Sequence, residues 1–295
     1  MTALSPAVVA AVDDLELAAR VVVDGLRVGG HRSPFHGYGA EFQQHRPYRA
    51  GDDLKYLDWK VYARSNRLYT RQFRETTNVA VMLVIDTSAS MAFPVGAATV
   101  TKFRYASIVA ASLAYLASEQ GNAVGLMSMT GEAMAYLPAR SGRAHLRALI
   151  ARIDGLTPTG TWHPGTVIGR AAELLQRRGL LVVLSDFYDD EGGTQRELRH
   201  VVQRGHDVSM LQMIAPEERA LTFREQTELQ DLETGARLLV EPATAAAAHR
   251  AAMTGFLERC RSFALHEGID YGMFDISEAP ERALRDYLVR RATQR

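Results

Sequence analysis

One carboxylate and two hydroxyls follow an apolar stretch of the sequence at a spacing that suits cation binding. The run VAVMLVI, residues 79–85, is rich in β-branched side chains and ends in the pattern D-x-S-x-S, made by Asp86, Ser88 and Ser90. Such a run is typical of a strand in a sheet that is covered on both faces. We therefore expect these three side chains at the carboxyl end of a buried strand, where open α/β sheets carry their ligand sites.

The oxygen atoms of Asp86, Ser88 and Ser90 are hard ligands, which suit Mg²⁺, or Mn²⁺ or Ca²⁺ in its place, far better than zinc. A cation held there needs further oxygens from neighbouring strand ends. The apolar run at 180–185 is followed by Asp186, which supplies a second carboxylate at the expected edge of the sheet. The alternative for all of these side chains is that they cap turns and helices.

Strand-like and helix-like patterns alternate from residue 78 to the end of the sequence. Strands are predicted at 79–86, 123–129, 133–138, 180–185, 208–214 and 271–276. Helices are predicted at 102–119, 143–153, 167–177, 194–204, 244–266 and 280–291. This alternation indicates an α/β fold with a doubly wound, mostly parallel six-stranded sheet that includes one antiparallel strand. An extra hairpin is predicted at 228–241, with Thr234-Gly235 at its centre.

Two further segments precede the α/β part of the chain. Residues 5–28 carry apolar side chains at three- and four-residue steps, which predicts an amphipathic helix. The next segment is aromatic, basic and broken by Gly and Pro, and we expect a small β-rich subdomain with strands at 41–48 and 68–74 that leans on the main sheet. The predicted regions are therefore 1–30, 31–77 and 78–295.

Composition narrows the classes of function. The sequence holds 34 Lys and Arg against 34 Asp and Glu, so no net charge attracts nucleic acid or an anionic membrane surface. No signal peptide opens the sequence and no apolar stretch is long enough to span a bilayer, so we expect a cytoplasmic protein without a membrane span. The single cysteine, Cys260, excludes an internal disulfide and lies on the apolar stripe of a predicted helix, which favours a buried, inert thiol.

The strand followed by D-x-S-x-S resembles the metal-ion-dependent adhesion site of the von Willebrand factor A (vWA) domain. The resemblance implies that Asp186 acts on the ion through water and that a loop threonine joins the ligands. The distance along the chain to Asp186 favours Thr161, whereas the helix that follows Thr166 favours that residue, and we choose Thr161. Incomplete coordination of this kind leaves one position that an acidic side chain of a partner protein can fill.

The segment before the apolar run at 79–85 resembles a known family more closely than the vWA pattern does. Together with the following vWA-like part, over about residues 30–215, it is similar to the bacterial domain-of-unknown-function family fifty-eight (DUF58). That family's pattern is G-x-G-x-EF, R-x-Y, GDD, a hydrophobe followed by DW, and then AR. The matching residues are Gly37, Gly39, Glu41, Phe42, Arg46, Tyr48, Gly51, Asp52, Asp53, Asp58, Trp59, Ala63 and Arg64.

The acidic residues of this segment, Asp52, Asp53 and Asp58, are interleaved with basic ones. Two interpretations are open, a recognition surface or a partly buried charge network. We favour the second, in which the ions and the Asp58-Trp59 pair hold the small subdomain on the main sheet.

The DUF58 resemblance implies an interaction protein and not an enzyme. Such proteins are typically encoded with MoxR-type AAA+ ATPases, so we expect a partner or adaptor of such an ATPase, in assembly or maturation of a client with an acidic docking residue. A metal-assisted hydrolase is the first alternative, although no His, Cys or Lys lies near these strand ends in sequence to act as a base. The second alternative is an oligomerisation module whose D-x-S-x-S loop binds nothing.

Overall fold

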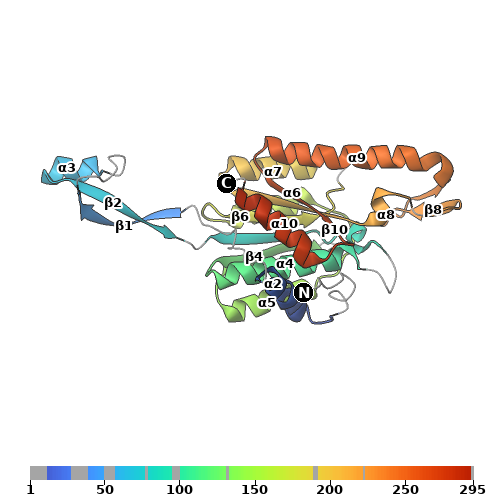
Figure 1. Ribbon diagram of the computed structural model, residues 1–295, viewed down its shortest axis with the longest axis horizontal. Coiled ribbons are helices and arrows are strands. Elements are labelled where there is room, and N and C mark those ends of the chain that lie inside the picture. Colours follow the sequence, from blue (N-terminus) through green and yellow to red (C-terminus); the bar gives the residue numbers. More distant parts are fainter. Residues whose placement is uncertain are drawn as a thin grey trace.

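A six-stranded sheet forms the centre of the molecule (Figure 1). The computed structural model describes residues 12–27, 39–49, 57–76, 79–94, 100–130, 133–188, 192–221 and 223–293. The strands of the main sheet are β3 (Ala80–Ile85), β4 (Ala123–Thr130), β5 (Ala133–Arg140), β6 (Leu180–Ser185), β7 (Asp207–Ile214) and β10 (Asp270–Asp275). Their order is β10-β7-β6-β3-β4-β5, and every neighbouring pair is parallel except β4 and β5. The predicted doubly wound, mostly parallel six-stranded sheet is confirmed.

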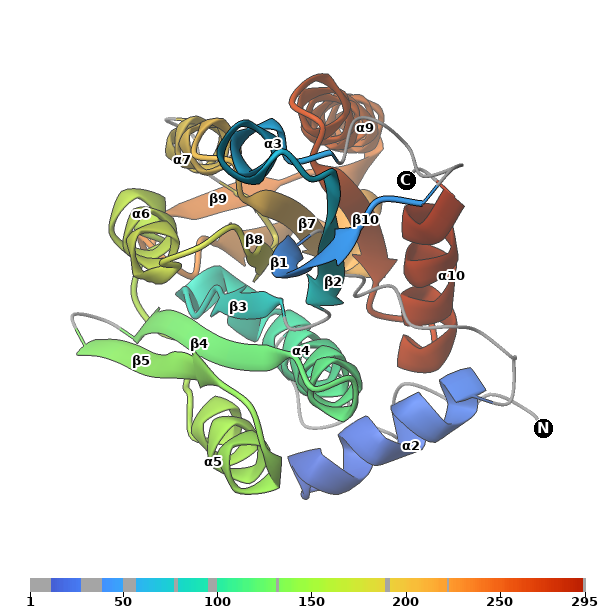
Figure 2. The same cartoon turned by 90° about the vertical axis from the view of Figure 1, so that its left-hand side faces the viewer.

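Helices cover both faces of the main sheet (Figure 2). One face carries α2 (Leu15–Arg27), α4 (Lys102–Glu119), α5 (Arg143–Asp154) and α10 (Pro280–Thr293). The other carries α6 (Pro164–Leu174), α7 (Gly193–Gln203) and α9 (Pro242–His266). In β3, Val81, Leu83 and Ile85 belong to the first apolar core, whereas Met82 and Val84 belong to the second. Because both faces of the strand are buried, its sequence is apolar without alternation.

The register of the central strands sets the position of the predicted site. β3 lies between β4 and β6, and Ile85 of β3 pairs with Leu184 of β6. The Asp86 amide continues this ladder by donating to the Leu184 carbonyl oxygen at 2.9 Å. Asp86 and Asp186 therefore leave neighbouring strands at the same carboxyl edge of the sheet, as expected from the sequence.

Two helices begin three or more residues away from their predicted starts. α6 begins at Pro164 and not at residue 167, because proline is favourable in the first turn, where a helix needs no amide hydrogen from it. α2 begins at Leu15, where the Asp14 carboxylate accepts hydrogen bonds from the Glu16 and Leu17 amides at 2.8 and 3.1 Å. Such a cap starts a helix. The part of the predicted helix before residue 12 lies outside the described residues.

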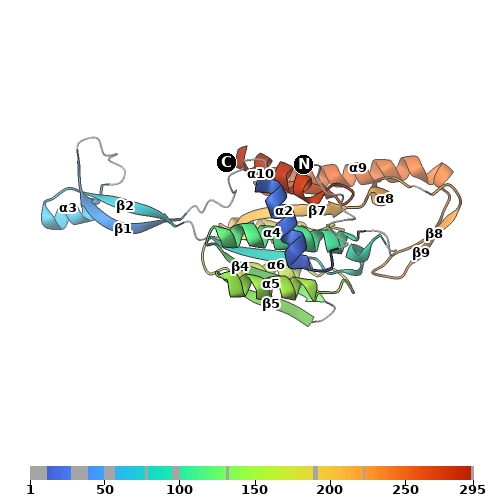
Figure 3. The ribbon, with the colours of Figure 1, turned by 60° about the horizontal axis from the view of Figure 1, so that its bottom comes forward.

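A second pair of strands, β1 (Gly39–Pro47) and β2 (Tyr69–Thr76), is antiparallel, and the short helix α3 (Trp59–Ser65) lies between them in sequence. Both strands predicted in this region are present. Figures 1 and 3 show this unit, which we call the arm, extending away from the main sheet and not leaning on it.

Local contacts account for the Asp58-Trp59 dipeptide of the arm. The Asp58 carboxylate caps α3 by accepting from the Lys60 and Val61 amides, at 3.0 and 3.1 Å. The Trp59 side chain is 63% exposed and contacts Tyr62 edge-on. Asp58 and Trp59 thus serve α3 itself. Asp52 and Asp53 lie outside the described residues.

The predicted hairpin is present as β8 (Thr227–Gln230) and β9 (Arg237–Val240), an antiparallel pair. It lies between the short helix α8 (Pro216–Arg219) and the long α9, at the end of the main domain opposite the arm (Figure 1). Across the described ranges, no helix combines the length and apolar character needed to cross a membrane.

Candidate functional site

Asp86 begins the candidate site, because it is the first residue after β3 and its side chain is fully buried. Both carboxylate oxygens accept a hydrogen bond. The Ser88 amide donates to Oδ1 at 2.8 Å, and the Ser185 hydroxyl donates to Oδ2 at 2.5 Å. The carboxylate is therefore fixed in place by the loop that follows β3 and by the last residue of β6.

Hydroxyls connect the loop to the second carboxylate. The 3₁₀ turn η2 (Ala89–Ala92) follows Ser88 and turns Ser90 back toward it, so that the two Oγ atoms lie 3.0 Å apart. Ser90 Oγ donates to Asp186 Oδ2 at 2.7 Å. Four of the predicted residues, Asp86, Ser88, Ser90 and Asp186, thus form one connected group across the ends of β3 and β6. We call residues 86–90 the DTSAS loop.

A lysine that the sequence did not place at the site lies beside Asp186. Lys102, the first residue of α4, is fully buried, and its Nζ lies 2.7 Å from Asp186 Oδ2 and 2.5 Å from Glu218 Oε1. Glu218 of α8 is itself held by the Ala215 amide, which donates to Oε2 at 2.8 Å. Burial alone would lower the pKa of Lys102, but the charges of Asp186 and Glu218 outweigh it and raise that pKa. The ammonium therefore keeps its proton.

The electrostatics of the group fit a divalent cation. Asp86, Asp186 and Glu218 bring three carboxylates to the site, and Lys102 brings one ammonium. Burial, together with the charge of Asp186, raises the pKa of Asp86 to about 7. A cation would offset this repulsion, and the available donors are carboxylate and hydroxyl oxygens, which Mg²⁺ and Ca²⁺ prefer. The described residues contain no group of three His, Cys, Asp or Glu side chains arranged for a metal.

The structure separates the two threonine candidates. The loop that carries Thr161 is bonded to the DTSAS loop, because the Thr159 amide donates to the Thr87 carbonyl oxygen at 2.7 Å and the Ala89 amide donates to that of Gly160 at 2.9 Å. The Thr161 hydroxyl itself lies 2.9 Å from His163 Nε2. Thr166 lies on the first turn of α6 and lines a different cavity, between α6 and α7. The loop that carries Thr161 thus adjoins the site, and the role of Thr161 as a ligand stays a prediction.

Sequence comparison places the chain in a family. The family model described as "Protein of unknown function DUF58" matches residues 44–259. The chain belongs to the DUF58 family. Uncharacterized proteins of Mycobacterium bovis and Mycobacterium tuberculosis are each 32% identical to it over 270 residues, which cover 86% of this chain and 83% of the relative.

The solved structures that resemble this DUF58 family member share little sequence identity with it. An aerotolerance-related membrane protein of Bacteroides fragilis, with multiple mutations to serine, is 19% identical with a TM-score of 0.48, over 72% of this chain and 100% of that one. BatB of Bacteroides thetaiotaomicron is 19% identical with a TM-score of 0.47, over 73% and 100%. The SpRpn10 vWA domain is 17% identical with a TM-score of 0.36, over 46% and 75%. No site residue is carried over from them.

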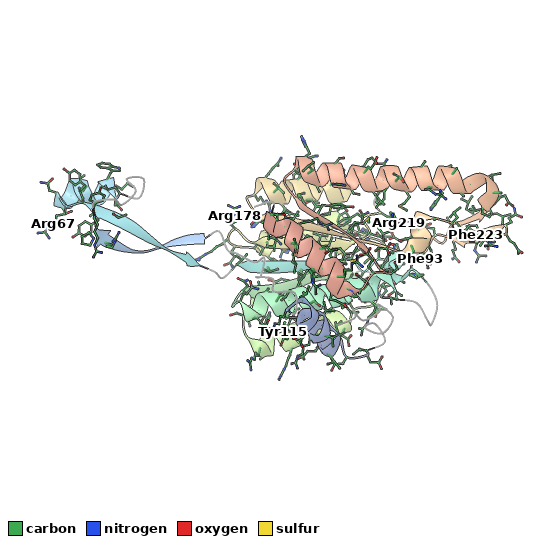
Figure 4. All side chains as sticks on the ribbon, in the orientation of Figure 1. Arg67, Phe93, Tyr115, Arg178, Arg219 and Phe223 are labelled. Atoms are coloured by element: carbon green, nitrogen blue, oxygen red, sulfur yellow. The ribbon has the colours of Figure 1, made fainter. Side chains whose placement is uncertain are left out.

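In this DUF58 chain, a further carboxylate reaches the DTSAS loop from the β8–β9 hairpin. Burial raises the pKa of Glu233 above its ordinary value and outweighs the opposite effect of the nearby Ser90 and Ser88 side chains and the Trp162 backbone. Glu233 and Ser90 also line one cavity of about 390 Å³, together with Phe93 and Tyr188. Figure 4 shows Phe93 at the end of the main domain opposite Arg67 of the arm. The site and the arm therefore lie at opposite ends of the molecule.

Lys102, Glu218 and Glu233 are the site residues that sequence analysis missed. The sequence held one hint of Lys102, because a charged lysine begins a predicted helix that is otherwise largely apolar. Glu218 and Glu233 lie in the PEER and DLETG segments, which read as ordinary polar turns. Cys260, in contrast, is buried as predicted, and its burial raises the pKa of the thiol to about 11.

Proposed function

We propose that this DUF58 family member binds a divalent cation, Mg²⁺ in the first place, at the DTSAS loop, and that the ion docks an acidic side chain of a partner protein. The observation that carries the proposal is the hydrogen-bonded group of Asp86, Ser88, Ser90 and Asp186 at the carboxyl ends of β3 and β6. Asp86 and the two serines would hold the ion, Asp186 would act through water, and Thr161 would join from its loop. The bound ion would supply the positive charge that attracts a carboxylate.

Neither Lys102 nor Cys260 offers the base or the nucleophile that a hydrolase needs. A general base must give up its proton near neutral pH, whereas the two carboxylates beside Lys102 raise its pKa and keep it charged. Cys260 is buried, and a thiol with a raised pKa is a poor nucleophile. Neither side chain supports the alternative of a metal-assisted hydrolase.

Family membership supports the choice of partner. A vWA-like fold in this family suggests a protein-interaction domain. From the family resemblance we infer that the partner is a MoxR-type AAA+ ATPase, its client, or both, and that the chain assists assembly or maturation of that client in the cytoplasm. The carboxylate that completes the cation site would belong to the ATPase or to the client.

The test is affinity capture from native lysate with the wild-type chain, in Mg²⁺ and in EDTA. The Asp86→Ala variant removes a proposed ligand, and Asp24→Ala, at an exposed position of α2, serves as the matched control. We expect an AAA+ ATPase or its client to be recovered by the wild type and by Asp24→Ala in Mg²⁺ alone. Recovery of the same proteins in EDTA, or by Asp86→Ala, would contradict cation-dependent docking.

A further inference from the structure

Glu233 lies where a partner's carboxylate is expected to dock. Its carboxylate lines one cavity with Ser90, and it lies close enough to the side chains of Ser90 and Ser88, two of the proposed ligands, and to the Trp162 backbone for these groups to act on its pKa. The chain thus places one of its own acidic side chains against both loops that would surround the ion. That side chain comes from a hairpin remote in sequence from the DTSAS loop.

The turn of the hairpin is built to present Glu233. Asp231 Oδ1 accepts hydrogen bonds from the Glu233 and Thr234 amides, both at 2.8 Å, and the Gly235 amide donates to the Asp231 carbonyl oxygen at 2.9 Å. Gly235 adopts a φ of 74°, which favours glycine. Among Asp231, Leu232, Glu233 and Thr234, Glu233 alone is half-buried and the others are exposed. The turn therefore holds the backbone rigidly and directs this one side chain inward.

The rest of the hairpin is weakly attached to the main domain. Leu238 and Leu239 of β9 are 66% and 61% exposed, and only Val240 of the two strands is buried. The cavity of about 390 Å³ separates the turn from Phe93, Tyr188 and Glu218. A two-stranded hairpin has little stability of its own. Moving the β8–β9 hairpin away from the main domain would thus break few apolar contacts.

Charge couples the position of the hairpin to the cation. Without an ion, the negative charge of Asp186 repels the Glu233 carboxylate. A bound divalent cation reverses the sign of that interaction. Binding of the ion and closure of the hairpin must then favour each other to the same extent.

We propose that Glu233 is an internal carboxylate ligand of the DTSAS loop, which closes the β8–β9 hairpin over the cation site, so that an acidic partner must displace the hairpin in order to dock. The inference rests on the proposed cation site. It assigns the hairpin a regulatory function: the resting protein occupies its own docking position. A partner whose carboxylate binds the ion weakly or is badly placed would fail to displace Glu233. The hairpin would therefore make the site selective among acidic partners.

The experiment measures Mg²⁺ binding by calorimetry and hydrogen–deuterium exchange of residues 227–240 with and without Mg²⁺. Three full-length proteins are compared: the wild type, Glu233→Gln, and Glu228→Gln as the matched control on the same hairpin, where Glu228 pairs with exposed Arg237 at 3.2 Å. We expect Mg²⁺ to slow exchange of the hairpin in the wild type and in Glu228→Gln, but not in Glu233→Gln. Mg²⁺ affinity should fall in Glu233→Gln alone, by about ten-fold or more, as is usual when a group supporting a metal site is removed.

Two different results would overturn the inference. If the wild type binds Mg²⁺ but Glu233→Gln binds it equally well and shows the same hairpin exchange, Glu233 is no ligand and the cation site stands without it. If the wild type binds no Mg²⁺, the proposed cation site fails, and the internal ligand fails with it.

Discussion

Asp86 accepts a hydrogen bond on each carboxylate oxygen, from the Ser88 amide and the Ser185 hydroxyl. The nearby ammonium of Lys102 contacts Asp186 and Glu218. At the residue scale, the site is therefore a set of ionisable groups whose protonation and stability depend on one another. Two predictions follow from this arrangement, one for Asp86 and one for Lys102.

The stability of the metal-free protein should depend on the ionisation of Asp86. Burial and the charge of Asp186 raise its pKa from 3.8 to about 7 on folding. Because the folded pKa is the higher one, the stabilising contribution is complete below about pH 4 and is lost as the pH rises through 7. In EDTA, wild-type stability should fall between about pH 4 and pH 7, by up to about 4 kcal/mol, and level off above pH 7. Urea denaturation at several pH values measures this fall.

Asp86→Asn is the control for this pH dependence, since it keeps the shape of the side chain and removes the titration. Its stability should change little over the same pH range. A wild-type profile with the same slope as that of Asp86→Asn would contradict the assignment to Asp86.

Lys102→Met should destabilise the fold strongly. The change leaves Asp186 and Glu218 buried beside each other without their ammonium, and removing one partner of a buried ion pair costs about 3–5 kcal/mol. Lys60→Met, on the exposed face of α3, is the matched control and should leave the main domain unaffected. Chemical denaturation followed by circular dichroism measures both variants. A loss below about 1 kcal/mol for Lys102→Met would show that Lys102 is not needed to balance the two carboxylates.

The residues found from the sequence and those missed differ in a simple physical way. Asp86, Ser88, Ser90 and Asp186 directly follow strands, so the apolar runs located them. Lys102 reaches Asp186 across 84 positions of sequence, and Glu218 reaches Lys102 across 116. No local pattern encodes such distances, because they depend on how α4 and α8 pack against the sheet end.

At the scale of elements, helix and strand types followed from periodicity, and α4 has the same bounds as predicted, residues 102–119. The observed helix bounds differ from the predicted ones where a capping residue or a proline outweighs the apolar periodicity, as at Pro164 of α6. Burial of both sheet faces explains why β3 shows no alternation of apolar and polar residues, since its side chains pack into an apolar core on each side. The close approach of β4 and β5 was not evident from the sequence, and it depends on a single glycine.

Gly125→Ala should destabilise the edge of the main sheet. Gly125 lies in β4 where the register with β5 shifts between Val124 and Leu126, and a Cβ there would lie 2.8 Å from the Ala139 nitrogen and 2.9 Å from the Leu137 carbonyl oxygen. Both atoms are backbone and can yield only if β5 moves, so we expect a loss of about 1–3 kcal/mol. Thermal unfolding measures the change.

Gly165→Ala is the matched control for that substitution. A Cβ at Gly165 would meet no atom within 4 Å, and the residue lies in α6, where alanine is the better helix former. The melting temperature should therefore stay the same or rise. Equal behaviour of the two variants would show that the β4–β5 contact does not require glycine.

At the scale of the whole molecule, the arm and the candidate site lie at opposite ends of the main domain (Figures 1 and 3). The sequence indicated both units but not this separation, because the path of the chain between the arm and β3 carries no periodic pattern. A molecule of this shape can contact one partner at the DTSAS loop and another at the arm.

The most direct test of the account is to locate the ion. Crystals of the protein grown or soaked with Mn²⁺ should give one anomalous peak within about 2.6 Å of the Ser88 and Ser90 hydroxyl oxygens and on the open side of Asp86. The same experiment with Asp86→Ala should give no peak there. Absence of the peak in the wild type, or a peak elsewhere on the chain alone, would contradict the claim that the DTSAS loop is a cation site.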